Sequence, residues 1–127
     1  MSTTPMTRSA ETEHEAIVQV ALDYFEGWFD GDPARMERAL HPALAKRSLA
    51  EDGRNVDHTT SVEMVDYTAR GSGKARDVPD RRIEVEVEDV YGSIANVTVR
   101  SAVYREYVQL ARTRDGWKIV NALWQRT

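Results

Sequence analysis

The chain has 127 residues, no cysteine and a formal net charge of -4. This length suits one domain that buries its own core, and the lack of cysteine excludes disulfides, a thiolate nucleophile and a cysteine zinc site. The acidic balance disfavours binding to nucleic acid, and no stretch is apolar over the about 18 residues of a membrane span, so we expect a cytoplasmic protein with no membrane partner.

The first helix is predicted by a capping signal and by helical spacing of apolar residues. Residues 1–11 are small and polar and predict a disordered tail, which precedes a single domain over 12–127. Thr12 and Glu15 have the spacing of a capping box, so the helix is expected to begin there. Gly31 is a natural stop. Two apolar rows lie between these signals: Ile17, Val20, Ala21, Tyr24 and Trp28, and Val18, Leu22, Phe25 and Phe29.

A second, short helix follows. Asp32-Pro33 reads as an N-cap followed by proline at the first helical position, and the helix is expected to run to about Leu40. His41-Pro42 ends it, because a residue before proline avoids the α region. Residues 43–50 predict a strand with poor alternation, and residues 51–55 predict a turn.

The third predicted helix repeats the capping signal of the first. Thr60 and Glu63 form a second capping box, and the helix is expected to end near Arg70. Residues 71–80 are rich in glycine, proline and charge and predict an exposed loop. Its basic residues are expected to be solvated rather than to bind an anion.

The last part of the chain changes from helical spacing to strict alternation. From Arg82 onward valines alternate with glutamates, which predicts a strand with one wet face. A turn over 91–93 with Gly92 in the left-handed region would complete a hairpin. This turn predicts three pairs across the hairpin: Val87 with Val97, Val85 with Val99 and Glu84 with Arg100. A second hairpin is expected between Tyr104–Thr113 and Trp117–Gln125.

Three local stretches resemble the nuclear transport factor 2-like superfamily. Residues 21–32 (ALDYFEGWFDGD) are similar to its first helix and Gly-Asp break, residues 39–42 (ALHP) to its second helix exit, and residues 115–121 (DGWKIVN) to its last hairpin. The chain most resembles the putative lumazine-binding and SnoaL-like branch over 13–126. The resemblance implies a cone-shaped α+β domain with three N-terminal helices packed on a curved, mostly antiparallel sheet. It also implies a homodimer through the sheet face.

The resemblance also suggests catalytic positions. Ketosteroid-isomerase-like members use a tyrosine of the first helix, a protonated acid on a late strand and a base near the first strand. Tyr24 matches the tyrosine, whereas the base position falls near Ser48 and the acid position near Tyr107. The missing base argues against that chemistry. Tyr24 could equally be a core aromatic with a satisfied hydroxyl.

The closer branch suggests a polar floor for a pocket. Its tyrosine-leucine-histidine-leucine pattern reads Tyr107-Val108-Gln109-Leu110 here, so a glutamine that cannot titrate replaces the histidine. Tyr107 and Gln109 share one face by parity, and Asn121 is expected opposite Gln109. The alternative is that Gln109 and Asn121 only hydrogen-bond each other beneath the helices.

The remaining candidates surround this floor. The predicted catalytic residues are Tyr24, His41 and Tyr107, and the predicted ligand-binding set is Tyr24, Trp28, His41, Arg47, Met64, Tyr107, Gln109 and Asn121. His41 either caps the second helix or points to the pocket mouth with Arg47. The spacing of the three histidines fits no metal site, so neither a metal nor a cofactor is expected.

Three functions are compatible with this pattern. The first is a dimeric pocket domain for an unidentified small hydrophobic or ring-containing molecule. The second is an isomerase, cyclase or dehydratase-like enzyme that acts on a hydrophobic ring or polyketide-like substrate through Tyr24, His41 or Tyr107. The third is an association module whose pocket is filled by its own aromatic side chains.

Overall fold

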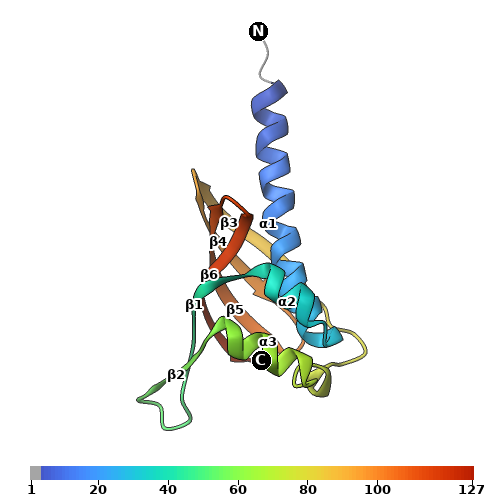
Figure 1. Ribbon diagram of the computed structural model, residues 1–127, viewed down its shortest axis with the longest axis vertical. Coiled ribbons are helices and arrows are strands. Elements are labelled where there is room, and N and C mark those ends of the chain that lie inside the picture. The colour runs from blue at the N-terminus through green and yellow to red at the C-terminus, as the bar shows by residue number, and fades with distance from the viewer. Residues whose placement is uncertain (1–3) are drawn as a thin grey trace.

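In the part of the chain that the structure describes, three helices cover one face of a six-stranded sheet (Figure 1). The predicted arrangement of three N-terminal helices on a mostly antiparallel sheet is confirmed, with one strand more than predicted. The computed structural model describes the backbone of residues 4–127 and the side chains of residues 10–127. Residues 1–3 of the predicted tail therefore lie outside the described residues. None of the described helices combines the length and the apolar composition that a membrane span requires.

The first helix begins earlier than its sequence signal predicts. Helix α1 spans Thr4–Asp30, so Thr12 lies inside it and does not cap its start. The residues between Pro5 and Thr12 include alanine, arginine and glutamate, which favour helix, and proline is tolerated in a first turn. The added turns project beyond the sheet (Figure 1). Gly31 follows the helix with a positive φ of 67°, which confirms the predicted stop.

The two shorter helices have the predicted caps. Helix α2 spans Pro33–Ala39, and the Asp32 side chain accepts a hydrogen bond of 3.2 Å from the Arg35 backbone N–H. Helix α3 spans Ser61–Ala69, and both hydrogen bonds of the capping box between Thr60 and Glu63 are present. The predicted loop that follows contains one short 3₁₀ turn, η1, over Lys74–Arg76.

The sheet has the order β2-β1-β6-β5-β4-β3. Its strands are β1 (Leu40–Leu49), β2 (Val56–Thr59), β3 (Glu84–Tyr91), β4 (Ile94–Arg100), β5 (Tyr104–Thr113) and β6 (Gly116–Arg126). Strand β1 is parallel to β6, and every other pair is antiparallel. Strand β2 was not predicted, because its four residues are mostly exposed and depend on pairing with β1.

The predicted register of both hairpins is confirmed, although their turns are shorter than predicted. The three expected pairs between β3 and β4 are present, and Gln109 lies opposite Asn121. Two-residue turns connect the strands in place of three-residue turns, because Tyr91 pairs with Ile94 and Thr113 with Gly116. A bulge in each hairpin restores the expected pairing by adding one residue to one strand.

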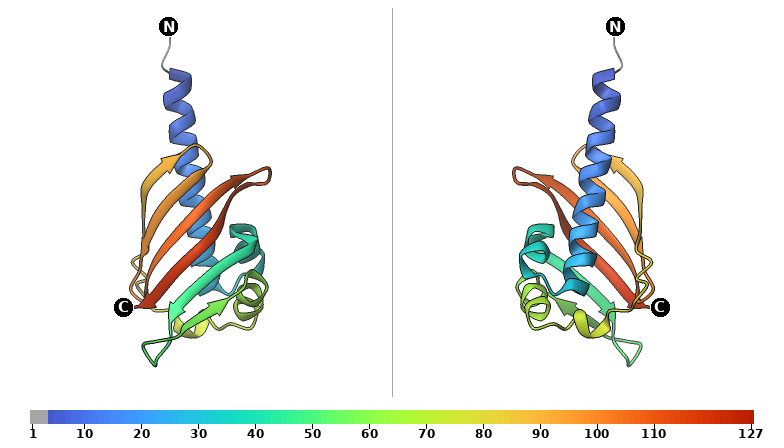
Figure 2. Two further views of the ribbon diagram at one scale, coloured as in Figure 1. Left: turned by 90° about the vertical axis from the view of Figure 1, so that its left-hand side faces the viewer. Right: turned by 90° about the vertical axis from the view of Figure 1, so that its right-hand side faces the viewer.

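The core lies between α1 and one face of the sheet. Phe29, Ile17 and Met36 from the helices, and Leu110, Ile119 and Val99 from the strands, are almost fully buried. The opposite face of the sheet carries no helix (Figure 2). We call this helix-free surface the outer face. One face of the sheet is therefore buried against helices and the other is not.

Candidate functional site

Three polar side chains meet inside the otherwise apolar core. The exposed fractions of Tyr24, Lys46 and Glu106 are 2%, 7% and 3%. The Tyr24 hydroxyl donates a hydrogen bond of 2.5 Å to Oε2 of Glu106 and accepts one from Nζ of Lys46. Nζ also lies 3.2 Å from the same Oε2. We call these three residues the buried cluster.

Each side chain of the buried cluster points into the core because of its position in the repeat of its helix or strand. Tyr24 lies on the apolar row of α1 that faces the sheet. Lys46 follows Leu44 by two residues on β1, and both are buried. Glu106 lies between Tyr104 and Val108 in the alternation of β5, so it shares their inward face. The parallel pairing of β1 with β6, and of β6 with β5, brings the two charges together.

The burial of the cluster changes its acid–base properties. Burial raises the pKa of the Tyr24 phenol well above its ordinary value, and the adjacent carboxylate of Glu106 raises it further. Burial lowers the pKa of the Lys46 ammonium, although the charge and hydrogen bond of Glu106 act in the opposite direction. Tyr24 is therefore neutral, and Lys46 holds its proton less tightly than an exposed lysine.

The hydroxyl of Tyr24 already both donates and accepts a hydrogen bond within the core. Its one proton points to Glu106, and its lone pair accepts from Lys46. This agrees with the alternative in which Tyr24 is a core aromatic with a satisfied hydroxyl. The late-strand acid position that the resemblance places near Tyr107 does not lie beside this hydroxyl, because Tyr107 lines the hollow on the outer face. The acid beside Tyr24 is Glu106, one residue earlier, because a shift of one position along a strand moves a side chain to the other face.

A small cavity adjoins the cluster. Its volume is about 20 Å³, room for roughly one water molecule. It is lined by Tyr24, Phe25, Trp28, Lys46, Met64, Tyr104 and Glu106. On its apolar side Nε1 of Trp28 donates a hydrogen bond of 3.1 Å to the Tyr104 hydroxyl. We call this space the interior cavity. In this conformation aromatic and methionine side chains fill most of it.

The structure separates the predicted ligand-binding residues into two groups. Tyr24, Trp28 and Met64 line the interior cavity. The other group lies elsewhere: Arg47, Tyr107, Gln109 and Asn121 line a hollow of about 860 Å³ on the outer face, and His41 lines neither space. Nδ1 of His41 instead accepts a hydrogen bond of 3.0 Å from the Ala43 backbone N–H, near the start of β1.

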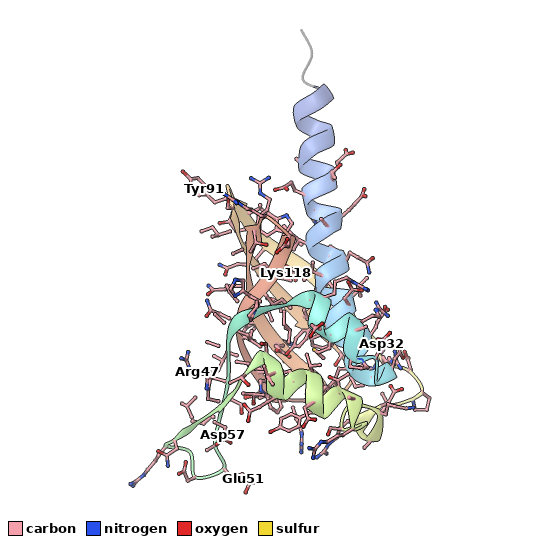
Figure 3. The ribbon with its side chains drawn as sticks, viewed as in Figure 1. Asp32, Arg47, Glu51, Asp57, Tyr91 and Lys118 are labelled. Atoms are coloured by element: carbon pink, nitrogen blue, oxygen red, sulfur yellow. The ribbon has the colours of Figure 1, made fainter. Side chains whose placement is uncertain are left out.

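The polar floor predicted beneath the helices lies on the outer face instead. Asn121 donates to Gln109, and Gln109 donates to Asn96, each over 2.9 Å. These amides therefore form a ladder across three strands. Arg47 extends from β1 away from the helices (Figure 3). The parity prediction was right about which residues share a face and wrong about which face it is, because Val108 and Leu110 occupy the inward positions.

Sequence analysis missed two members of the buried cluster. The signal for Glu106 was present, because it has the parity of the apolar residues Tyr104 and Val108. Lys46 carried a weaker signal, since the alternation of residues 43–50 is poor. Among the described residues, no three histidine, aspartate or glutamate side chains are arranged to hold a metal ion.

Comparison with known proteins supports the architecture. The family model described as "Putative lumazine-binding" matches residues 12–125. No curated protein shows significant similarity to the chain. A nuclear transport factor 2-like protein of unknown function from Silicibacter pomeroyi superposes with a TM-score of 0.64 at 14% identity, with 100% of both chains covered.

Two further solved structures have the same fold. A nuclear transport factor 2-like protein of unknown function from Methylobacillus flagellatus has a TM-score of 0.68 at 15% identity, with 91% of this chain and 93% of that chain covered. A protein from Streptomyces avermitilis, described as a putative dehydratase of the same fold family, has a TM-score of 0.65 at 18% identity, with 93% and 98% covered. With the family match and this architecture, the chain belongs to the "Putative lumazine-binding" family of nuclear transport factor 2-like proteins.

Proposed function

We propose that the protein binds a small molecule in the interior cavity, with the buried cluster as its polar end. The observation that carries this proposal is a buried ion pair, Lys46 with Glu106, at the edge of an apolar cavity. Burying two charges costs several kcal/mol per ion, and apolar side chains of similar volume often stabilise a fold better. Apolar walls with a few convergent polar groups are the usual composition of a ligand site.

The chemistry of the cluster restricts the ligand. Lys46 and Glu106 carry opposite charges, so the cluster is neutral as a whole and favours an uncharged ligand. Oε1 of Glu106 accepts no hydrogen bond from the described part of the chain, and Lys46 has a third ammonium proton. A suitable molecule therefore has an apolar or ring-shaped body and one neutral polar group that accepts a hydrogen bond from Lys46 or donates one to Glu106.

The cavity must widen to admit such a molecule. Met64 on the short helix α3 is the lining residue best suited to move, because a methionine side chain is unbranched and adapts its shape. Trp28 also lines the cavity and is only partly buried. Displacement of the Met64 side chain would open the cavity without breaking the hydrogen bonds that join Tyr24, Lys46 and Glu106.

Binding can be tested with 2-naphthol, a neutral ring with one hydroxyl. In nitrogen-15 spectra the indole N–H of Trp28 is expected to shift on titration, because it borders the interior cavity. The indole N–H of Trp117 is an internal control, since it donates to Glu13 away from the cavity. Equal shifts at both indoles, or no shift at Trp28, would contradict the proposed site.

A matched pair of variants assigns the binding to the cluster. Glu106→Gln is expected to weaken the naphthol-dependent shift of Trp28, because the substitution removes the acceptor charge inside the cavity. Glu84→Gln makes the same chemical change at an exposed position on β3 and is expected to leave binding unchanged. Unaltered binding by a folded Glu106→Gln variant would place the ligand elsewhere.

We also propose that the outer face joins two copies of the chain. Tyr107 and Leu123, neighbours across β5 and β6, have exposed fractions of 53% and 54%. Exposed side chains of this size, rimmed by polar residues, are typical of an association surface. The amide ladder beside them offers hydrogen-bond partners to a second copy.

The charges at the two ends of this surface suggest the geometry of the dimer. Glu88 borders the hollow on the β3 side and Arg47 on the β1 side. A two-fold axis parallel to the strands would place the acidic end of one copy against the basic end of the other. An axis across the strands would place like charges together. The first arrangement is therefore favoured.

A further inference from the structure

The amine of Lys46 is placed where it could react with a molecule in the interior cavity. Its side chain lines that cavity and is 9% exposed. Nζ lies 4.9 Å from the ring centre of Tyr24 and 5.2 Å from that of Trp124. Glu106, the one carboxylate among the described residues that line the cavity, has Oε2 3.2 Å from the same nitrogen.

We propose that Lys46 is a nucleophile that condenses with the carbonyl group of a small aldehyde or ketone in the interior cavity. The proposal rests on the proposed function, because the carbonyl compound must enter the same cavity. It adds a reaction, the reversible formation of an imine. Lysines that form imines are typically set in apolar pockets beside an acid–base group, and this is the setting of Lys46.

The reaction can be balanced with the groups that are present. The ammonium of Lys46 passes one proton to the carboxylate of Glu106, which leaves a neutral amine and a carboxylic acid. A bond forms between Nζ and the carbonyl carbon as the C=O π bond breaks. The carbonyl oxygen takes the proton of Glu106, and the nitrogen returns one proton to the carboxylate.

The second half of the reaction releases water. The carboxylic acid of Glu106 protonates the new hydroxyl, the C–O bond breaks, and the nitrogen lone pair forms the C=N bond. The products are a protonated imine on Lys46, a carboxylate on Glu106 and one water molecule. No oxidant or reductant is required, and the ion pair between the two residues is present before and after the reaction.

The surroundings support each proton transfer. Burial lowers the pKa of the Lys46 ammonium, which makes its neutral form easier to reach. Tyr24 donates to Oε2 of Glu106 and thereby leaves Oε1 free to exchange protons with the substrate. Tyr24 is therefore a positioning residue in this scheme, and Lys46 and Glu106 are the groups that touch the reacting atoms.

The lining also restricts the carbonyl compound. Trp28, Phe25 and Met64 provide apolar walls, and the one cationic side chain among the lining residues, Lys46, is already paired with Glu106. A substrate with its own carboxylate would meet the charge of Glu106 without a free cation to offset it. The expected substrate is therefore a small, uncharged aldehyde or ketone.

The chain contains three lysines, Lys46, Lys74 and Lys118, and this makes a direct test possible. The full-length protein is incubated at pH 7 with propanal and sodium cyanoborohydride, which fixes any imine as a stable alkyl group. Chymotryptic peptides are then followed over time by mass spectrometry. We expect Lys46 to be alkylated faster than Lys74 and Lys118, although it is the most buried of the three.

A purely structural lysine would give the opposite order, because burial would protect it. Labelling of Lys46 that is slower than, or equal to, that of both other lysines would overturn the proposal. The native chain decides this without any variant. As a second measurement, Glu106→Gln is expected to slow the labelling of Lys46 several-fold, and Glu84→Gln to leave it unchanged.

The test is separable from that of the proposed function. 2-Naphthol has no carbonyl group, so its effect on the Trp28 indole reports cavity binding alone. Binding of naphthol without preferential labelling of Lys46 would support the proposed binding site and contradict the proposed imine formation. Preferential labelling of Lys46 without naphthol binding would support the reactivity of the Lys46 amine. It would also mean that the cavity admits only molecules smaller than a fused ring.

Discussion

At the scale of single residues, Lys46 and Glu106 depend on each other. Both side chains are buried, and Nζ of Lys46 lies 3.2 Å from Oε2 of Glu106, so each charge compensates the other. The Tyr24 hydroxyl is a hydrogen-bond partner of both. Removing one partner of a buried pair leaves an uncompensated charge, whereas removing both leaves an apolar core. Comparing the stabilities of the single and double variants therefore distinguishes an ion pair retained for function from one required for folding.

We expect Lys46→Met to lower the free energy of unfolding by about 3–5 kcal/mol, because Glu106 would be left charged and unpaired. The double variant Lys46→Met with Glu106→Met is expected to regain most of that loss or to exceed the wild type. Urea denaturation followed by tryptophan fluorescence measures both. If the double variant were as unstable as the single one, the pair itself would stabilise the fold, and its functional interpretation would lose its main support.

At the scale of elements, one carboxylate links the first two helices. Asp23 of α1 is 5% exposed and accepts hydrogen bonds from Arg35 and Arg38 of α2 at 3.0 and 3.2 Å. Burial alone would raise the pKa of Asp23, but the hydrogen bonds from Arg38, Gln19 and Arg35 together lower it. The link matters for the site because α1 carries Tyr24, the next residue along the chain.

The lowered pKa of Asp23 predicts how stability depends on pH. A carboxylate whose pKa is lower in the folded state stabilises the protein above its unfolded pKa, near 3.8, and this contribution disappears as the pH falls through the folded value. The difference in melting temperature between wild type and Asp23→Asn is therefore expected to be largest at pH 7 and to shrink below about pH 4.

The control for this measurement is Asp115→Asn. Asp115 lies in the exposed turn between β5 and β6, and Asn-Gly suits such a turn as well as Asp-Gly does. This variant is expected to match the wild type at both pH values. A difference between wild type and Asp23→Asn that stayed constant from pH 7 to pH 3 would mean that the ionised Asp23 does not hold α2 in place.

At the scale of the whole molecule, the two faces of the sheet have different surroundings. The helices close one side of the sheet (Figure 2), and the interior cavity lies on that side, beside the buried cluster. The other side carries the exposed residues Tyr107 and Leu123. The proposed ligand site and the proposed dimer surface therefore use opposite faces of the sheet.

Charge reversal tests the proposed dimer. Arg47→Glu is expected to weaken dimerisation, because it places two acidic ends together, and adding Glu88→Arg to the same chain is expected to restore it. Sedimentation equilibrium measures the mass of each variant. Arg54→Glu, in the exposed loop between β1 and β2, is the matched control and is expected to remain dimeric. A monomeric wild type, or a double variant that stayed dissociated, would contradict the proposed arrangement.

The sequence by itself determined the features that depend on neighbouring residues. The capping box at Thr60, the N-cap at Asp32 and the left-handed glycine at Gly31 act over a few residues, so they could be predicted directly. The registers of the two hairpins also followed from alternation, since a shift by one residue would have exposed the apolar side chains. The start of α1 was missed, because the capping signal at Thr12 lies within a stretch that continues as helix.

Tertiary structure decided the candidate site. Tyr24, Lys46 and Glu106 lie on three elements, and only the parallel pairing of β1 with β6 brings Lys46 near Glu106. No local pattern encodes that pairing, because it depends on how the helices and the second hairpin pack. Whether Glu106 or Tyr107 points inward likewise depended on which face of β5 the helices cover. The covered face is the one that buries the most apolar area, and this area depends on all strands of the sheet together.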